Sequence, residues 1–223
     1  DGTEVWRGGT FASGYCSPQL VTLGRVPQIL LTHWQTVAGH DPETGAVLWT
    51  FDNWPKGQPK VPQPIVVDDR RVLASAGYGV GCRMLEVTRG DDGRWNVKEL
   101  WKSIRLKPKF TNLAVRDGFA YGIDDGGSFM CLDLADGKMK WRSARDAHFG
   151  HGQPLLVDDL LLIQTEDGEL VFAAADPAEY RELGRIRVLP ADTTSWNSPA
   201  LWGKFLICRN DLEAACFELP TEK

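Results

Sequence analysis

The most constraining feature of this sequence is an internal repeat that ends in tryptophan. A small polar residue, a glycine, three variable residues and a tryptophan follow one another at residues 1–6, 44–49 and 136–141. Trp49 and Trp141 are 92 residues apart, which is twice 46. Self-similarity with a period of about 20 to 50 residues is typical of repeat architectures such as solenoids and propellers.

A second marker supports the same period. After each long loop, a polar residue followed by proline or asparagine opens an apolar run, and this second residue stands at positions 18, 64, 112, 154 and 199. The steps between these positions are 46, 48, 42 and 45 residues. Five anchors at so regular a step predict five similar units, at about residues 15–58, 59–107, 108–150, 151–192 and 193–223.

Within a unit, short apolar runs alternate with turns. In the third unit the runs cover residues 113–115, 119–121 and 129–132, and a fourth run contains Trp141. The Asp-Gly turns between runs supply the positive φ that a tight hairpin needs. No segment keeps a 3.6-residue period, so we expect little helix, with one helical turn allowed in residues 173–184. Four short antiparallel strands per repeat predict the blade of a β-propeller.

The repeat resembles that of a known family. The pattern Asp-x-x-Thr/Asp-Gly-x-x-x-Trp at residues 41–49 and 133–141 is similar to the repeat of the pyrroloquinoline-quinone-like (PQQ-like) β-propellers. Outer-membrane-assembly lipoproteins and quinoprotein dehydrogenases carry such repeats. The resemblance covers essentially the whole chain, with two departures: Trp101 follows an insertion at 89–96, and residues 185–187 stand where a tryptophan strand is expected. Such a motif specifies fold better than function.

The predicted fold class is therefore all-β, a single PQQ-like propeller domain over residues 1–223 with about five four-stranded antiparallel blades. The fifth unit has only three apolar runs, whereas the chain begins with a Gly-x-x-x-Trp segment at residues 1–7. In one arrangement this segment completes the last blade and removes its exposed edge. In the other, the chain is an arc of a larger propeller, because family members resemble rings of seven or eight blades and each blade packs mainly on its neighbours.

Residues that recur at one position of the repeat are expected to be structural. The tryptophans are predicted to pack between blades, and the glycines to form the turns before the fourth strands. These residues are Trp6, Trp49, Trp101, Trp141, Gly45 and Gly137.

Composition excludes several classes of function. The net charge is −5, from 25 basic and 30 acidic residues, and no basic run indicates a nucleic-acid partner. No apolar run approaches the roughly 20 residues of a membrane-spanning helix. The five cysteines have neither metal-ligand nor disulfide-framework spacing. A two-residue turn at 211–212 would pair Cys208 with Ala215, which argues against a disulfide between Cys208 and Cys216.

The sequence offers no catalytic site. The quinoprotein dehydrogenases in the resembling family hold their cofactor with calcium, an aspartate base and, in several, an adjacent cysteine pair, and this chain has no Cys-Cys and no calcium-ligand cluster. His148 and His151 form His-x-x-His, but zinc needs further ligands and none has suitable spacing. No nucleophile elbow, phosphate-binding loop or zincin motif occurs. We therefore expect no catalytic residue, no metal and no cofactor, neither PQQ nor calcium.

Non-repeating aromatic and basic residues gather in the loops of one end. Loops from a fourth strand to the next first strand lie on the same face as loops between second and third strands. Such residues have no packing role that the repeat dictates, and aromatic side chains are enriched at interface hot spots. The alternative is that they cap the blade ends. The candidate binding residues are Tyr15, Trp34, Trp54, Tyr78, Lys109, His148, His151, Trp196 and Asn197.

We interpret the chain as a non-catalytic propeller, a scaffold that binds a protein, peptide or glycan through this face. Two other interpretations stay open: a fragment or subunit of a quinoprotein-like dehydrogenase, and a ligand-sensing domain of a larger receptor. The family resemblance implies a periplasmic or extracytoplasmic location. We expect a monomer with no nucleic-acid partner and no membrane-spanning segment.

Overall fold

A computed structural model describes residues 1–220 of this chain. The described residues contain nineteen β-strands and one 3-10 turn, Arg145–Ala147. The all-β prediction is confirmed. The helical turn allowed for residues 173–184 is wrong, because these residues end one strand, cross a short loop and begin the next. Among residues 1–220, no helix is long and apolar enough to cross a membrane.

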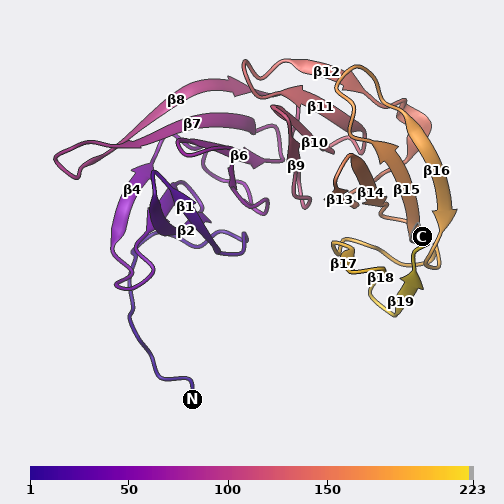
Figure 1. The fold of residues 1–223 in the computed structure, drawn as a ribbon, viewed down its shortest axis with the longest axis horizontal. Helices are drawn as coiled ribbons and strands as arrows, with labels where there is room; N and C mark the ends of the chain where they lie inside the picture. The colour runs from indigo at the N-terminus through magenta and orange to yellow at the C-terminus, as the bar shows by residue number, and fades with distance from the viewer. Residues whose placement is uncertain (221–223) are drawn as a thin grey trace. The chain divides into compact units, whose positions relative to one another are not determined.

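The described chain separates into two compact units, which divide between Lys107 and Pro108. The first unit holds two antiparallel sheets, each ordered as in the sequence (Figure 1). The strands of the first sheet are β1 (Gln19–Leu23), β2 (Val26–Thr32), β3 (Val37–His40) and β4 (Val47–Phe51). Those of the second are β5 (Ile65–Val66), β6 (Arg71–Ala76), β7 (Gly81–Arg89) and β8 (Trp95–Ser103).

The second unit holds three sheets of the same kind. The third sheet contains β9 (Ala114–Arg116), β10 (Phe119–Ile123), β11 (Phe129–Asp133) and β12 (Met139–Arg142). The fourth contains β13 (Gln153–Val157), β14 (Leu160–Gln164), β15 (Glu169–Ala174) and β16 (Glu182–Arg187). The fifth has three strands in the described residues: β17 (Ala200–Trp202), β18 (Phe205–Arg209) and β19 (Ala214–Glu218). Each sheet falls inside one of the expected repeat units.

A register shift in the fourth strand marks the position of the repeat tryptophan. Next to the shift, Trp49 pairs with Gly39, Trp101 with Met84 and Trp141 with Cys131. In the fourth sheet, Gly184 takes the corresponding place, opposite Phe172. A bulge of this kind bends the strand and increases its twist. The register shift therefore recurs in all four of these sheets. The tryptophan recurs in three of them, and the fourth sheet has the shift without the tryptophan.

The tryptophan of the third sheet packs against the fourth sheet. Trp141 is 8% exposed, and its ring lies 5.9 Å from the rings of Tyr121 and Phe129 and 5.7 Å from that of Tyr180. Its Nε1 donates a hydrogen bond of 2.8 Å to the carbonyl oxygen of Asp176, in the loop between β15 and β16. The buried cluster around it includes residues of β10, β11, β14 and β15. One outer-strand side chain thus joins two successive sheets.

The first sheet uses its tryptophan in the same role. Trp49 is buried in a cluster that includes Leu85 and Val87 of the second sheet. Its Nε1 donates to Oε1 of the buried Gln28 at 2.7 Å, which satisfies the polar atom inside this core.

The N-terminal segment repeats this contact against the first sheet. Trp6 donates from Nε1 to the carbonyl oxygen of Pro42 at 2.9 Å, and its ring covers Gly45, where a Cβ would lie 2.3 Å from a ring carbon. Gly45 and Gly137 have φ of +73° and +72°, as their turns require. Residues 1–7 form no strand, so the closing strand expected in one of the two arrangements is not formed among the described residues.

Replacing Trp141 with alanine should lower the free energy of unfolding by about 3–5 kcal/mol, because the change opens a cavity between two sheets and leaves the Asp176 carbonyl without its donor. Urea unfolding followed by circular dichroism measures the loss. The matched control is Trp202→Ala. Trp202 is 80% exposed, so its loss should change stability by less than about 0.5 kcal/mol. Equal effects of the two substitutions would contradict a packing role for the outer-strand tryptophan.

Candidate functional site

Loops of the second unit bring aromatic, basic and acidic side chains together at one end of its sheets. They are the loops before β9, between β12 and β13 and between β16 and β17, together with the tight turn between β14 and β15. We call this group the loop face, and define it by Lys109, Phe110, His151, Glu166 and Trp196.

The centre of the loop face is a stack of two aromatic rings. Phe110 and Trp196 lie with ring centroids 4.8 Å apart at an interplanar angle of 29°. The imidazole of His151 lies in T-shaped contact with both rings, with its centroid 5.1 Å from that of Phe110 and 6.2 Å from that of Trp196. The Nζ of Lys109 lies 5.5 Å from the Phe110 ring centroid, within cation–π range. Trp196 is 46% exposed, so an indole already held in place is presented to solvent.

Glu166 holds the indole of Trp196 and the backbone at His151. One carboxylate oxygen accepts a 2.9 Å hydrogen bond from Nε1 of Trp196, and the other accepts a 2.8 Å bond from the backbone N–H of His151. Gly150 makes this approach possible, because a Cβ there would lie 2.2 Å from the carboxylate and its φ of +57° favours glycine. A carboxylate with two donors from different loops holds both loops in one geometry.

The buried side chain of Gln153 forms hydrogen bonds with the same loops. Its side chain is 3% exposed, and its Nε2 donates to the carbonyl oxygens of Phe110 and Trp196 at 2.8 and 3.0 Å. Its Oε1 accepts from the backbone N–H of Asn112 at 3.2 Å. One buried amide therefore links loops that belong to three successive sheets, which preorganises the face.

The environment of His151 keeps its imidazole neutral. Burial is the largest influence and lowers its pKa from the ordinary value of 6.5. Lys109 lowers the pKa further, whereas Glu166 and Asp125 oppose the shift. Its Nδ1 is buried without a hydrogen-bond partner among the described residues. The loop face thus presents a neutral ring at neutral pH rather than an additional cation.

Two other predicted residues of this unit lie near the loop face. His148 is exposed and borders a hollow of about 250 Å³, together with Gly150, Glu166 and Asp167. Asn197 follows Trp196 directly and is half-buried. The structure therefore brings together Lys109, His151 and Trp196, with His148 and Asn197 at the edge.

The four predicted residues of the first unit have different environments, and Tyr78 among them is half-buried in the turn between β6 and β7. Tyr15 is 69% exposed, and Trp34 is half-buried with the Nζ of Lys60 at 6.0 Å from its ring centroid. Trp54 is only 3% exposed and lies under the guanidinium of Arg83, at 5.8 Å. The prediction that Trp54 offers a ring to a partner is therefore not supported, because its loop folds back onto the core.

Sequence reasoning missed Phe110, Glu166 and Gln153. A signal was present for Gln153, since Gln-Pro opens both the second and the fourth unit. Gln63, its counterpart, donates from Nε2 to the carbonyl oxygen of Ser17 in the preceding repeat at 3.3 Å. No signal of this kind marked Glu166, whose partners are 15 and 30 residues away.

Among the described residues, 1–220, no group of three or more His, Cys, Asp or Glu side chains is placed to hold a metal ion. All five cysteines are free thiols. Cys208 pairs in register with Ala215, as the hairpin arithmetic predicts.

The strand order, repeat period and inter-sheet tryptophans define a β-propeller of PQQ-like repeats. The family described as outer membrane protein assembly factor BamB matches residues 33–181, and the chain belongs to this family. A curated relative, BamB from Xanthomonas campestris pv. campestris, is 30% identical over 137 residues, which is 61% of this chain. The chain spans only 30% of that relative's length.

Solved structures show the same fold at low identity. BamB from Moraxella catarrhalis aligns with 93% of this chain and 73% of its own, at 13% identity and a TM-score of 0.51. A quinohemoprotein alcohol dehydrogenase from Pseudomonas putida HK5 aligns with 96% of this chain and 42% of its own, at 13% identity and a TM-score of 0.65. The computationally designed protein Ika4 aligns with 78% of this chain and 99% of its own, at 17% identity and a TM-score of 0.57.

The loop face predicts a measurable titration. The ring protons of His151, followed by NMR, should give a pKa below 6.5, and Trp196→Ala should raise it toward 6.5 because the ring becomes more exposed. Since the folded pKa lies below the unfolded one, the contribution of His151 to stability is present above about pH 6.5 and is lost as the pH falls. Trp202→Ala, outside the loop face, should leave the titration unchanged. A pKa at or above 6.5 in the unmodified chain would contradict this assignment.

Proposed function

We propose that this chain is a non-catalytic binding module that holds a protein partner through the loop face. The observation that supports this most strongly is the half-exposed indole of Trp196, which is stacked on Phe110 and anchored by Glu166. A rigid aromatic side chain loses little conformational entropy on binding, and tryptophan is enriched among interface hot spots.

The chemistry of the face favours a mixed apolar and acidic partner surface. The stacked rings offer apolar area, and Lys109 places a positive charge beside them. A protein segment that carries an apolar or aromatic residue next to an acidic one would fill both features. A neutral glycan would leave the charge of the lysine without a counter-charge, so the lysine favours an acidic protein segment.

The name of the matching family suggests where such a partner acts. Its members are described as outer membrane protein assembly factors. By this relation, the partner would be a component of outer membrane protein assembly, and the chain would work in the periplasm. The likeness to a quinohemoprotein dehydrogenase concerns the fold, and we propose that this chain uses neither a quinone nor calcium. Absorbance of PQQ with calcium, titrated with the chain, should show no change.

Capture from a detergent-solubilised envelope extract, with the retained protein identified by mass spectrometry, tests the proposal. Trp196→Ala should reduce capture of that protein by about thirtyfold, which corresponds to about 2 kcal/mol at a hot spot. The free energy of unfolding of the Trp196→Ala variant should fall by only about 1 kcal/mol, since one partly exposed ring contact and one hydrogen bond are lost. Trp202→Ala is the control of equal chemistry outside the loop face and should capture normally. If both variants capture equally well, the loop face is not the binding surface.

A further inference from the structure

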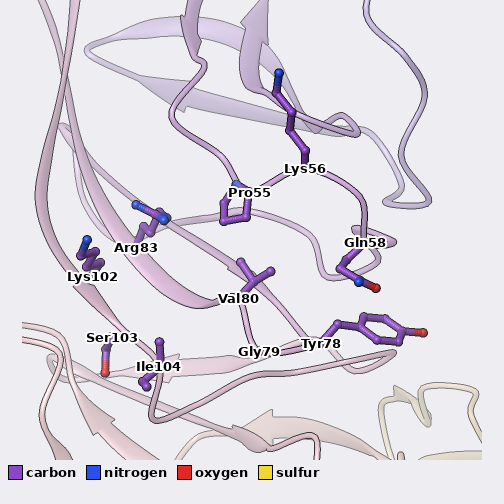
Figure 2. A pocket seen from close by; sticks show the side chains of 10 residues that line it. All are labelled: Pro55, Lys56, Gln58, Tyr78, Gly79, Val80, Arg83, Lys102, Ser103 and Ile104. Carbon is purple, nitrogen blue, oxygen red and sulfur yellow. The ribbon is translucent and has the colours of Figure 1, made fainter.

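A pocket of about 540 Å³ lies in the first unit and shares no residue with the loop face. It is bordered by the turn between β6 and β7, the loop after β4 and the end of β8 (Figure 2). Its volume lies within the roughly 300–1,000 Å³ of small-ligand sites. Tyr78 is the one predicted binding residue that lines it.

The pocket is cationic in a chain that is acidic overall. Lys56, Arg83 and Lys102 line it, and none of its lining residues is an aspartate or glutamate. The whole chain carries a net charge of −5, so the sign of charge in the pocket is opposite to that of the chain as a whole. Lys56 and Lys102 are exposed, which leaves both ammonium groups accessible to a ligand. Concentrated positive charge in a concave site attracts anions and raises their local concentration.

Arg83 is held in place from two sides. Its guanidinium forms an ion pair with Glu99 and lies over the ring of Trp54 at 5.8 Å. Only one of its nitrogen atoms, Nη1, bonds to Glu99. Glu99 compensates one charge of the site, and the two lysines carry the remaining excess. The pocket is therefore lined by one guanidinium held in place and by two exposed lysines.

The turn that carries Tyr78 adopts an unusual backbone for an aromatic residue. Tyr78 has φ of +56°, and the next residue, Gly79, has φ of +81°. The turn is closed by a hydrogen bond of 3.1 Å from the N–H of Val80 to the carbonyl oxygen of Gly77. Bulky residues rarely occupy the left-handed region, and such outliers cluster at functional sites. In Figure 2 the Tyr78 ring lies at one end of the pocket, and Arg83 and Lys102 lie at the other.

We propose that this pocket binds an organic anion with two or more carboxylates. Lys56 and Lys102, on different sides of the lining in Figure 2, each offer a positive charge to a carboxylate group, and the Tyr78 side chain lies at the end opposite Lys102. Pro55, Val80 and Ile104 supply apolar lining for the hydrocarbon that separates the charges, which inorganic phosphate does not have. The same chemistry occurs in a free polycarboxylate and in consecutive acidic side chains of a peptide. This inference does not depend on the loop face.

Isothermal titration calorimetry of the full chain tests it with three probes: citrate, acetylated triglutamate amide and, as a neutral control, acetylated triglutamine amide. At least one carboxylate probe should bind, triglutamine should not, and the affinity should fall with added salt. Lys102→Glu and Lys56→Glu should each weaken binding by about tenfold.

Lys98→Glu is the matched control. Lys98 is an exposed lysine on the same strand as Lys102, β8, and does not line the pocket, so this variant should bind as the unmodified chain does. All three lysines are exposed, so their variants should keep the far-ultraviolet circular dichroism of the fold. Tighter binding of citrate would identify a free polycarboxylate, and tighter binding of triglutamate an acidic peptide. No heat with either probe at millimolar concentration, or an equal loss in Lys98→Glu, would overturn the proposal.

Discussion

The contact between an outer-strand tryptophan and the following sheet is the interaction on which the rest of this structure depends. A single four-stranded sheet has two faces and cannot bury both by itself, so each blade needs a neighbour. Trp49 and Trp141 make that contact inside each unit, with the indole in a shared core and its N–H bonded to an oxygen. Trp6 makes the same type of contact from a segment that forms no strand.

This packing also determines where function is possible. Since the buried strand residues pack between sheets, both candidate sites are formed by loop residues and by residues near the ends of strands. Gln153 shows how the two requirements meet: it opens a strand of the repeat, yet its amide bonds to loops of the neighbouring sheets. The loop face is therefore held by contacts within the chain itself.

Much of the fold could be predicted from the sequence because strands obey local rules. The repeat period and the apolar runs separated by turns were sufficient for the five sheets, and the length of one turn was sufficient for the pairing of Cys208 with Ala215. Loop residues obey no such rule. Trp54 resembles an exposed loop tryptophan in the sequence, yet it is buried under Arg83. Its place in the core of the first unit, beside the guanidinium of Arg83, is not encoded by any local pattern.

The same reasoning explains why only part of each candidate site was predictable. Residue type and loop position identified Lys109, His151 and Trp196, because the repeat period places their loops at one end. Glu166 was not identifiable, since an acidic residue in a tight turn is usually there for local backbone reasons. Its second role becomes visible only when loops 15 and 30 residues away meet it in space. A repeat therefore predicts which loops converge, whereas the polar contacts that orient their side chains depend on distances that only the folded chain defines.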